Sequence, residues 1–123
     1  MINNDGNFFR SEIVHFPPGI HGSVNKNDAI AVGDINGDNL PDVVISQGKI
    51  NPYYVDRDLQ ILINTGDGFV DETQSRIENL RNEYNGHAEG HTYLIDFDSD
   101  GDLDIFDFQA NVVDGYSVSN NDA

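Results

Sequence analysis

Short apolar runs rich in β-branched residues recur along the chain, separated by polar turn residues. In the middle of the sequence they occupy residues 29–32, 43–46, 59–63 and 69–73. Each run is too short for a typical helix and is bounded by Gly, Asn, Asp or Pro, which is the pattern of β-strands. Because the four runs follow one another directly along the chain, they predict a four-stranded antiparallel meander.

The segments between these runs predict turns, one loop and one helix. Residues 64–68 predict a tight turn, and residues 48–57 a loop that carries Tyr53 and Tyr54. Those two rings can pack over the edge of the sheet or stack on a sugar. Residues 72–85 have apolar positions spaced for a helix of one to three turns, which would link the meander to the next unit.

Two acidic segments share one pattern at an offset of 62 residues. Residues 34–42 read Asp-Ile-Asn-Gly-Asp-Asn-Leu-Pro-Asp, and residues 96–104 read Asp-Phe-Asp-Ser-Asp-Gly-Asp-Leu-Asp. Residues 2–8 match residues 63–69 at an offset of 61. Two independent matches at nearly the same offset indicate a repeated unit, and the chain is about two units long.

The second unit is less complete than the first. Residues 93–95 and 103–106 repeat the first two strands around the second acidic segment, whereas residues 110–123 are polar and predict no defined element. The chain as a whole is therefore predicted to be all-β.

Composition narrows the range of functions. Six Lys and Arg against 22 Asp and Glu give the 123 residues a formal charge of −16. Such a chain repels nucleic acid and anionic membrane surfaces alike. No apolar run approaches the roughly 18 residues that span a bilayer, so membrane insertion is not expected, and any export signal lies outside this sequence. The absence of cysteine excludes disulfides, thiolate nucleophiles and Cys–zinc sites.

The two acidic segments have the ligand spacing of a Ca²⁺ loop. Ca²⁺ takes six to eight oxygen ligands, and a tight loop supplies them from side chains at positions 1, 3, 5 and 9 and a backbone carbonyl at position 7. The first acidic loop (residues 34–42) offers Asp34, Asn36, Asp38, Asp42 and the Leu40 carbonyl; the second acidic loop (residues 96–104) offers Asp96, Asp98, Asp100, Asp104 and the Asp102 carbonyl. We therefore expect two Ca²⁺ sites.

Other interpretations of these loops are weaker. Two solvated Asp/Gly turns would hold many like charges close together without a cation. An EF-hand or dockerin loop would continue to an acidic residue at position 12 and enter a helix. Position 12 of the first loop is Ile45, inside an apolar run, and Asp107 of the second lies in a segment of period two.

The acidic loops and their flanking strands resemble FG-GAP repeats, also described as VCBS-type repeats, of integrin α-subunit propellers and bacterial extracellular proteins. The likeness covers most of residues 28–73 and 91–108. It implies four-stranded propeller blades with Ca²⁺ between the first two strands of each, bound by the residues that the spacing selects. Asn39 stands where the family usually has glycine, and two repeats fall short of a closed propeller.

The resemblance divides the chain into three parts. Residues 1–27 would be the third and fourth strands of one blade plus a linker, residues 28–85 a complete blade, and residues 86–123 the first half of the next. This order predicts exposed strand edges, either within a longer array or in head-to-tail pairing of copies, and an isolated copy that is not a well-behaved monomer.

The expected function is an extracellular, secreted or cell-surface Ca²⁺-binding module without catalysis. It would serve adhesion, binding of a protein or carbohydrate partner, or assembly with other copies. The alternative is a scaffold portion of a polysaccharide-active lyase or hydrolase with catalytic residues elsewhere. His87, Glu89 and His91 lack the helical spacing of a zinc site, so a structural role is expected for His91.

Overall fold

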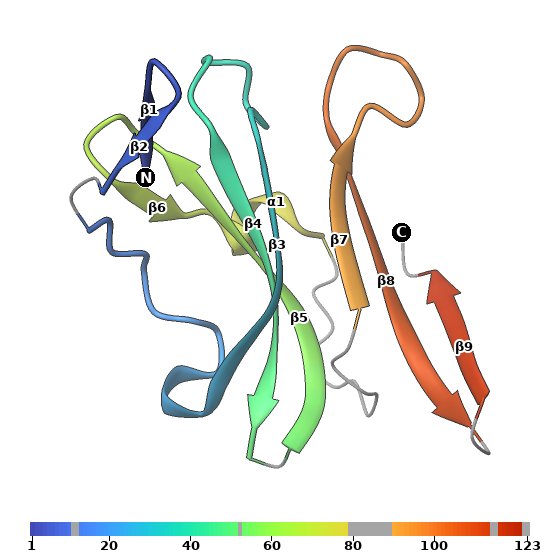
Figure 1. Cartoon of the computed structure of the whole chain (residues 1–123). Helices are drawn as coiled ribbons and strands as arrows, with labels where there is room; N and C mark the ends of the chain where they lie inside the picture. Colours follow the sequence, from blue (N-terminus) through green and yellow to red (C-terminus); the bar gives the residue numbers. More distant parts are fainter. Residues whose placement is uncertain (11–12, 52, 79–89, 114–115, 122–123) are drawn as a thin grey trace.

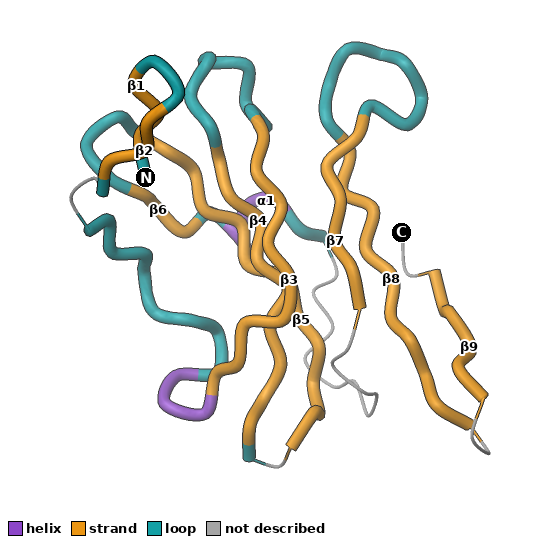
Figure 2. The backbone as a smooth tube through the Cα atoms, in the orientation of Figure 1, coloured by secondary structure: helices purple, strands orange, loops and turns teal. Residues whose placement is uncertain are grey.

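The computed structural model describes residues 1–10, 13–51, 53–78, 90–113 and 116–121. The described chain is mostly β-strand with almost no helix, and its strands form three antiparallel sheets. Figures 1 and 2 show the four-stranded sheet in the centre, a short hairpin on one side of it and the three-stranded sheet on the other. The prediction of an all-β chain is confirmed.

The central sheet is the predicted meander. Its strands are β3 (Asn25–Gly33), β4 (Asp42–Ile50), β5 (Tyr53–Asn64) and β6 (Phe69–Asp71), hydrogen-bonded in that order. All three pairings are antiparallel.

The prediction of a loop at residues 48–57 is wrong. Strand β4 continues to Ile50 and β5 already begins at Tyr53, so the two strands extend almost to their connecting turn, and Tyr53 and Tyr54 belong to β5. The register shifts around Lys49 show how the sheet accommodates Gly48, because a bulge inserts an irregular residue without ending the strand.

The three-stranded sheet consists of β7 (Gly90–Ile95), β8 (Asp104–Val113) and β9 (Tyr116–Asn121). Its β7–β8 register reproduces that of β3–β4 at the 62-residue offset: Val32 pairs with Val43 and Leu94 with Ile105, and four neighbouring pairs agree in the same way. Strand β9 corrects the expectation that only two strands follow the linker. The strand is rich in polar residues and contains no apolar run, so the hydrophobic pattern does not predict it.

The N-terminal hairpin pairs β1 (Ile2–Asn4) with β2 (Asn7–Phe9). It repeats the β5–β6 register at the 61-residue offset. A single 3-10 turn, η1 (Gly22–Val24), precedes β3, and the predicted linker helix is the short α1 (Thr73–Arg76). Residues 79–89, which the helix prediction included in part, lie outside the described residues.

The core lies on both faces of the central sheet. On what we call the linker face, Val43, Ile45 and Leu62 are buried with Phe69 against them. The chain before β3 covers this face, where the Phe16 and Phe69 rings meet edge to face at 4.9 Å.

The opposite, stacking face packs against the three-stranded sheet. Val44, Ile61 and Ile63 are buried there, with Leu94 and Ile105 packed against them. Gly33 permits this approach, since a Cβ at that position would lie 2.8 Å from Leu103 Cδ1 and 3.2 Å from Leu94 Cδ1.

None of the three described sheets closes on itself. Within the described ranges, no helix has the length and apolar character needed to cross a membrane.

Candidate metal centre

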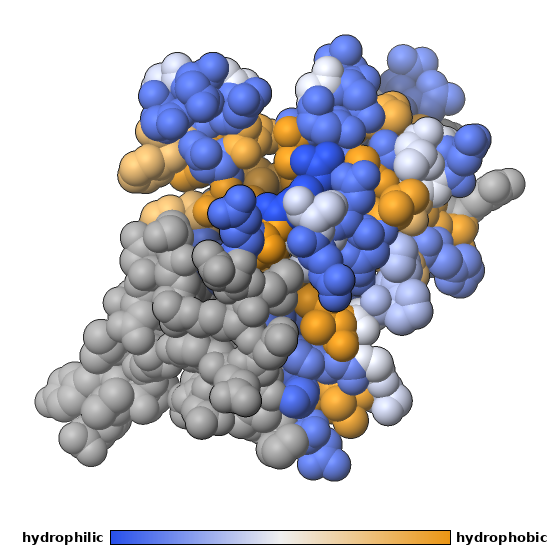
Figure 3. All heavy atoms as spheres, turned by 180° about the vertical axis from the view of Figure 1, so that it is seen from behind, coloured by the Kyte–Doolittle hydropathy of each residue, from blue (hydrophilic) through white to orange (hydrophobic). Residues whose placement is uncertain are grey.

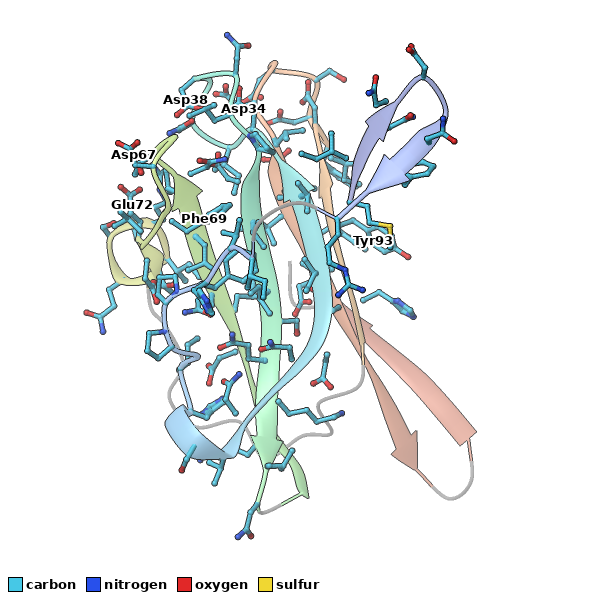
Figure 4. All side chains as sticks on the ribbon, turned by 60° about the vertical axis from the view of Figure 1, so that its left-hand side comes forward. Asp34, Asp38, Asp67, Phe69, Glu72 and Tyr93 are labelled. Atoms are coloured by element: carbon cyan, nitrogen blue, oxygen red, sulfur yellow. The ribbon has the colours of Figure 1, made fainter. Side chains whose placement is uncertain are left out.

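Both acidic loops lie at the same end of the molecule, each connecting the first two strands of its sheet. The first loop joins β3 to β4 and the second joins β7 to β8. Figure 4 labels Asp34 and Asp38 in the first loop and Asp67 in the neighbouring β5–β6 turn. Hydrophilic residues gather over this end in the view of Figure 3. The fold thus places two carboxylate-rich loops on neighbouring sheets.

The first residue of each loop organises the backbone that follows it. Asp34 Oδ1 accepts hydrogen bonds from the backbone N–H groups of Gly37 (2.8 Å) and Asp38 (3.2 Å), and its Oδ2 accepts one from Asn39 (2.8 Å). Such side-chain-to-backbone bonds wind the loop around its own first carboxylate.

The second loop repeats this arrangement at the 62-residue offset. Asp96 Oδ1 accepts from the N–H of Asp100 and Oδ2 from that of Gly101, both at 3.0 Å. Asp100 N–H also lies 3.2 Å from Asp98 Oδ1, as Asp38 N–H lies 3.3 Å from Asn36 Oδ1. The two loops therefore share one backbone design despite their different sequences.

Position 9 differs between the loops. Asp42 is fully buried, and its Oδ2 accepts from Ile35 N–H at 2.8 Å while its Oδ1 accepts from Asn64 N–H at 2.9 Å. Asp104 keeps the first of these bonds, from Phe97 N–H to Oδ2 at 2.9 Å, but is only partly buried. The carboxylate at position 9 thus ties its loop to the start of the second strand, and in the first loop also to β5.

Positions 5 and 7 are linked in the same way in both loops. Leu40 N–H donates to Asp38 Oδ1, and Asp102 N–H donates to Asp100 Oδ1, each at 2.9 Å. In the first loop, Asn36 Nδ2 also donates to Asp38 Oδ2 at 3.2 Å. That amide bond occupies an oxygen which the all-carboxylate second loop leaves available.

Each loop needs two residues in the left-handed backbone region, at positions 4 and 6. In the first loop these are Gly37 (φ +79°) and Asn39 (φ +65°); in the second they are Ser99 (φ +63°) and Gly101 (φ +99°). Asn tolerates this region better than other residues with a Cβ, which explains how Asn39 replaces the expected glycine.

One group of carboxylates within the described residues has an arrangement that could hold a metal ion. Oxygens of Asp96, Asp98 and Asp104 all lie within 4.8 Å of one another. Asp100, predicted as the ligand at position 5, does not contribute an oxygen to this group, and Asp34, Asp38 and Asp42 do not form an equivalent one. An all-oxygen donor set of this kind suits a hard cation such as Ca²⁺ or Mg²⁺.

A buried polar network on the linker face was not predicted from the sequence. Gln47 Nε2 donates to Gln60 Oε1 at 2.6 Å, and both side chains are almost fully buried. Gln60 Nε2 in turn donates to Pro18 O and to Asp71 Oδ2, each at 2.9 Å. The network fixes the linker and the edge strand β6 to the sheet. Gln47 pairs with Asp58 and Gln60 with Ile45, so the two glutamines are diagonal neighbours and no pattern of directly paired polar residues marks the network in the sequence.

Asp71 is the carboxylate most affected by this network. Burial alone would raise the pKa of Asp71, but hydrogen bonds from Gln60, from the Thr73 hydroxyl and from the Thr73 N–H outweigh it and hold that pKa below its ordinary value of 3.8. Asp71 is thus an anchor of β6 rather than an acid–base group.

The remaining candidates do not form a site among the described residues. His91 lies in β7 and its ring stacks against Tyr93 with centroids 6.3 Å apart. His87 and Glu89 lie outside the described residues. His21, predicted to be a loop residue, places its Nε2 3.3 Å from Asp58 Oδ2, and both side chains are largely buried.

Comparison with protein-family models, with curated proteins and with solved structures finds no match to this chain. Function is therefore inferred from the acidic loops and the sheets that carry them.

Proposed function

We propose that the protein is a Ca²⁺-binding module of the FG-GAP or VCBS type, in which one structural Ca²⁺ sits in each acidic loop between the first two strands of a propeller-type blade. The observation that carries the proposal is the convergence of Asp96, Asp98 and Asp104 oxygens within 4.8 Å. Three carboxylates at that separation repel one another unless a cation neutralises them.

The loop backbone supports the same proposal. In both loops the first carboxylate is held by backbone N–H groups, so its oxygens are oriented before any ion arrives. Binding would then require little further ordering of the loop, and most of the electrostatic gain would appear as stabilisation. The side chains at positions 1, 3, 5 and 9 and the carbonyls of Leu40 and Asp102 would supply the ligands.

The role of the ion is mechanical. Bound Ca²⁺ would tie the end of one strand to the start of the next, at Gly33 and Asp42 in the central sheet and at Ile95 and Asp104 in the other. Such sites are occupied where Ca²⁺ is millimolar, which is outside the cell. The stiffened surface would then serve adhesion, partner or glycan binding, or assembly.

Thermal unfolding in Ca²⁺, in Mg²⁺ and in chelator tests the proposal. We expect a higher melting temperature in Ca²⁺ than in chelator, and a smaller effect of Mg²⁺ at the same concentration, because Mg²⁺ demands near-ideal octahedral geometry and retains its water. A melting temperature that chelator leaves unchanged would contradict a structural role for the ion. Equal protection by Mg²⁺ would contradict the assignment to Ca²⁺.

A further inference from the structure

We propose that Asn36, at position 3 of the first acidic loop, is a modification site that loses its side-chain amide by deamidation, through a succinimide formed with the backbone nitrogen of Gly37. Water is the only co-reactant. The aspartate product would give the first loop the carboxylate pattern of the second. Only this consequence, a change in Ca²⁺ affinity, rests on the proposed function.

The dipeptide Asn36–Gly37 supplies both reacting groups. The nucleophile is the backbone nitrogen of Gly37, and the electrophile is the side-chain carbon Cγ of Asn36. Both residues are exposed, and a Cβ built on Gly37 would meet no atom within 4 Å. Because glycine has no side chain to hinder its nitrogen, the approach to Asn36 Cγ is open and water reaches the site.

The loop restrains the carbonyl that is attacked. Asn36 Oδ1 accepts a hydrogen bond from Asp38 N–H at 3.3 Å, which closes a short ring containing both Asn36 Cγ and the Gly37 nitrogen. This ring limits the side chain to conformations beside the Gly37 peptide, so less freedom is lost on attack. The same bond stabilises the negative charge that develops on Oδ1.

A carboxylate accepts the proton that must leave the nucleophile. Asp34 Oδ1 accepts the Gly37 N–H at 2.8 Å, which is within the reach of a general base. As the Gly37 nitrogen bonds to Asn36 Cγ, its proton passes to Asp34. Asp34 then returns a proton as the Cγ–Nδ2 bond breaks, ammonia leaves, and the succinimide ring remains.

Water opens the succinimide at one of its two carbonyls. Opening at the former side-chain carbonyl gives an aspartate at position 36, and opening at the backbone carbonyl gives an isoaspartate. The aspartate loses the amide bond from Asn36 Nδ2 to Asp38 Oδ2 and places a carboxylate where the second loop has Asp98, a member of the converging carboxylate group. The isoaspartate lengthens the backbone by one carbon and would disturb the winding of the loop around Asp34.

Asn64 has the restrained carbonyl without the rest of the site. Its Oδ1 also accepts from the N–H two residues further on, that of Gly66, at 2.9 Å. The intervening residue is Thr65, which carries a side chain and donates its N–H to Gly68 O at 2.9 Å instead of to a carboxylate. Asn64 is therefore an internal control that lacks the unhindered nucleophile and the base.

Peptide mass spectrometry of the full chain, incubated in chelator at neutral pH, measures the reaction. The chain is sampled over days and digested, and fragmentation of the peptides locates each amide-to-acid conversion. We expect conversion of Asn36 to be several-fold faster than that of Asn64. A parallel sample unfolded in urea should convert Asn36 no faster than the folded chain does, because the loop supplies the restrained carbonyl and the base.

Two loop variants test the nucleophile and the base separately. Gly37→Ser should slow conversion several-fold, and the loop backbone accommodates serine there, since Ser99 occupies the same position of the second loop at a φ of +63°. Asp34→Asn keeps an oxygen acceptor for the Gly37 N–H but removes the base, so it should also slow conversion. The matched control is Glu78→Gln, which removes a charge at an exposed residue outside both loops and should leave the rate unchanged.

The inference is overturned if Asn36 converts no faster than Asn64, or if Gly37→Ser converts at the rate of the unsubstituted chain. It is also overturned if the unfolded chain loses the Asn36 amide while the folded chain keeps it, since the loop would then protect the amide. A rate that Asp34→Asn leaves unchanged would refute the assignment of the base.

Calorimetric Ca²⁺ titration separates this failure from that of the proposed function. Asn36→Asp reproduces the aspartate product and should bind Ca²⁺ at the first loop several-fold more tightly than the unsubstituted chain. Conversion of Asn36 in chains that bind no Ca²⁺ refutes only the proposed function. Tighter Ca²⁺ binding by Asn36→Asp, without conversion of Asn36 in the unsubstituted chain, refutes only the modification.

Discussion

The central sheet and the three-stranded sheet each begin with an equivalent pair of strands joined by an equivalent acidic loop, but the two sheets differ in the segments that cover them. The β3–β4 and β7–β8 registers coincide at the 62-residue offset, and so do five hydrogen bonds of the two loops. Both faces of the central sheet are covered and its inner residues are buried. On the outer face of the other sheet, Tyr93 and Ile95 are nearly half exposed.

The difference between the two sheets shows which properties of an acidic loop depend on its own residues and which depend on a strand distant in the chain. The loop conformation is specified by side chains within it, since it forms whether or not a hairpin covers position 9. Burial of the position-9 carboxylate follows the strand beside it, because Asp42 also accepts a bond from Asn64 of β5, whereas among the described residues the bond shown for Asp104 comes from Phe97 of its own loop. The carboxylate at position 9 is therefore buried in the central sheet and more accessible in the three-stranded sheet.

Core truncation should produce the largest difference between the sheets. Leu62→Ala removes a fully buried side chain and should lower the free energy of unfolding by about 2–5 kcal/mol. Ile105→Ala, at a partly buried position on the other sheet, should cost no more than about half of that. Urea denaturation measures both, and equal losses would show that the three-stranded sheet is as well packed as the central one.

The next largest effect is expected at position 9. Asp42→Ala leaves two backbone N–H groups without their acceptor in a buried setting, at a cost of about 3 kcal/mol. Asp104→Ala removes one such bond at a partly exposed site, for about 1–2 kcal/mol. Both are compared by urea denaturation in chelator, so that ion binding does not contribute. A larger loss at Asp104 would contradict the difference in burial.

Acid should weaken the central sheet through Asp71, which has no counterpart among the described residues of the other sheet. Its pKa is lower in the folded chain than the unfolded value of 3.8, so its stabilisation is present above 3.8 and is lost as pH falls through the folded pKa. Gln60→Leu removes a bond that lowers this pKa, so the destabilisation it causes at neutral pH should shrink below 3.8. A gap between the two unfolding curves that is constant with pH would refute this role.

The smallest effect is expected at loop positions 4 and 6, where the backbone is left-handed. The first loop has its glycine at position 4 and the second has it at position 6. Ser99→Gly should stabilise the second loop by up to about 1 kcal/mol, and Asn39→Gly should stabilise the first by less, because Asn tolerates a positive φ better than Ser. Thermal unfolding in chelator ranks the two. A larger gain at Asn39 would reverse the expected order.

The elements that could be predicted from the sequence are those specified by residues close together in the chain. The meander, the turn at residues 64–68 and the backbone design of both loops follow from alternating apolar runs, from Gly and Asn, and from Asp at fixed spacing. Strand β9 was not predicted, because it has few apolar residues. The loop predicted at residues 48–57 was wrong, because bulges around Lys49 let the two strands continue.

Packing between separate elements could not be predicted from the sequence either. The contact of Gly33 with Leu94 and Leu103 and the network of Gln47, Gln60 and Asp71 join residues distant in the chain. Such pairings depend on how sheets stack, which a single sequence does not specify.

Calorimetric Ca²⁺ titration of one matched pair of variants decides whether the two acidic loops bind the ion. Asn36 and Asp98 occupy position 3 of the two loops, and only Asp98 belongs to the converging carboxylate group. The prediction is two binding events in the unsubstituted chain, the tighter one in the all-carboxylate second loop; Asp98→Ala should remove the tighter event and Asn36→Ala the weaker one. A chain that binds no Ca²⁺ at millimolar concentration, or in which neither substitution changes the titration, would contradict it.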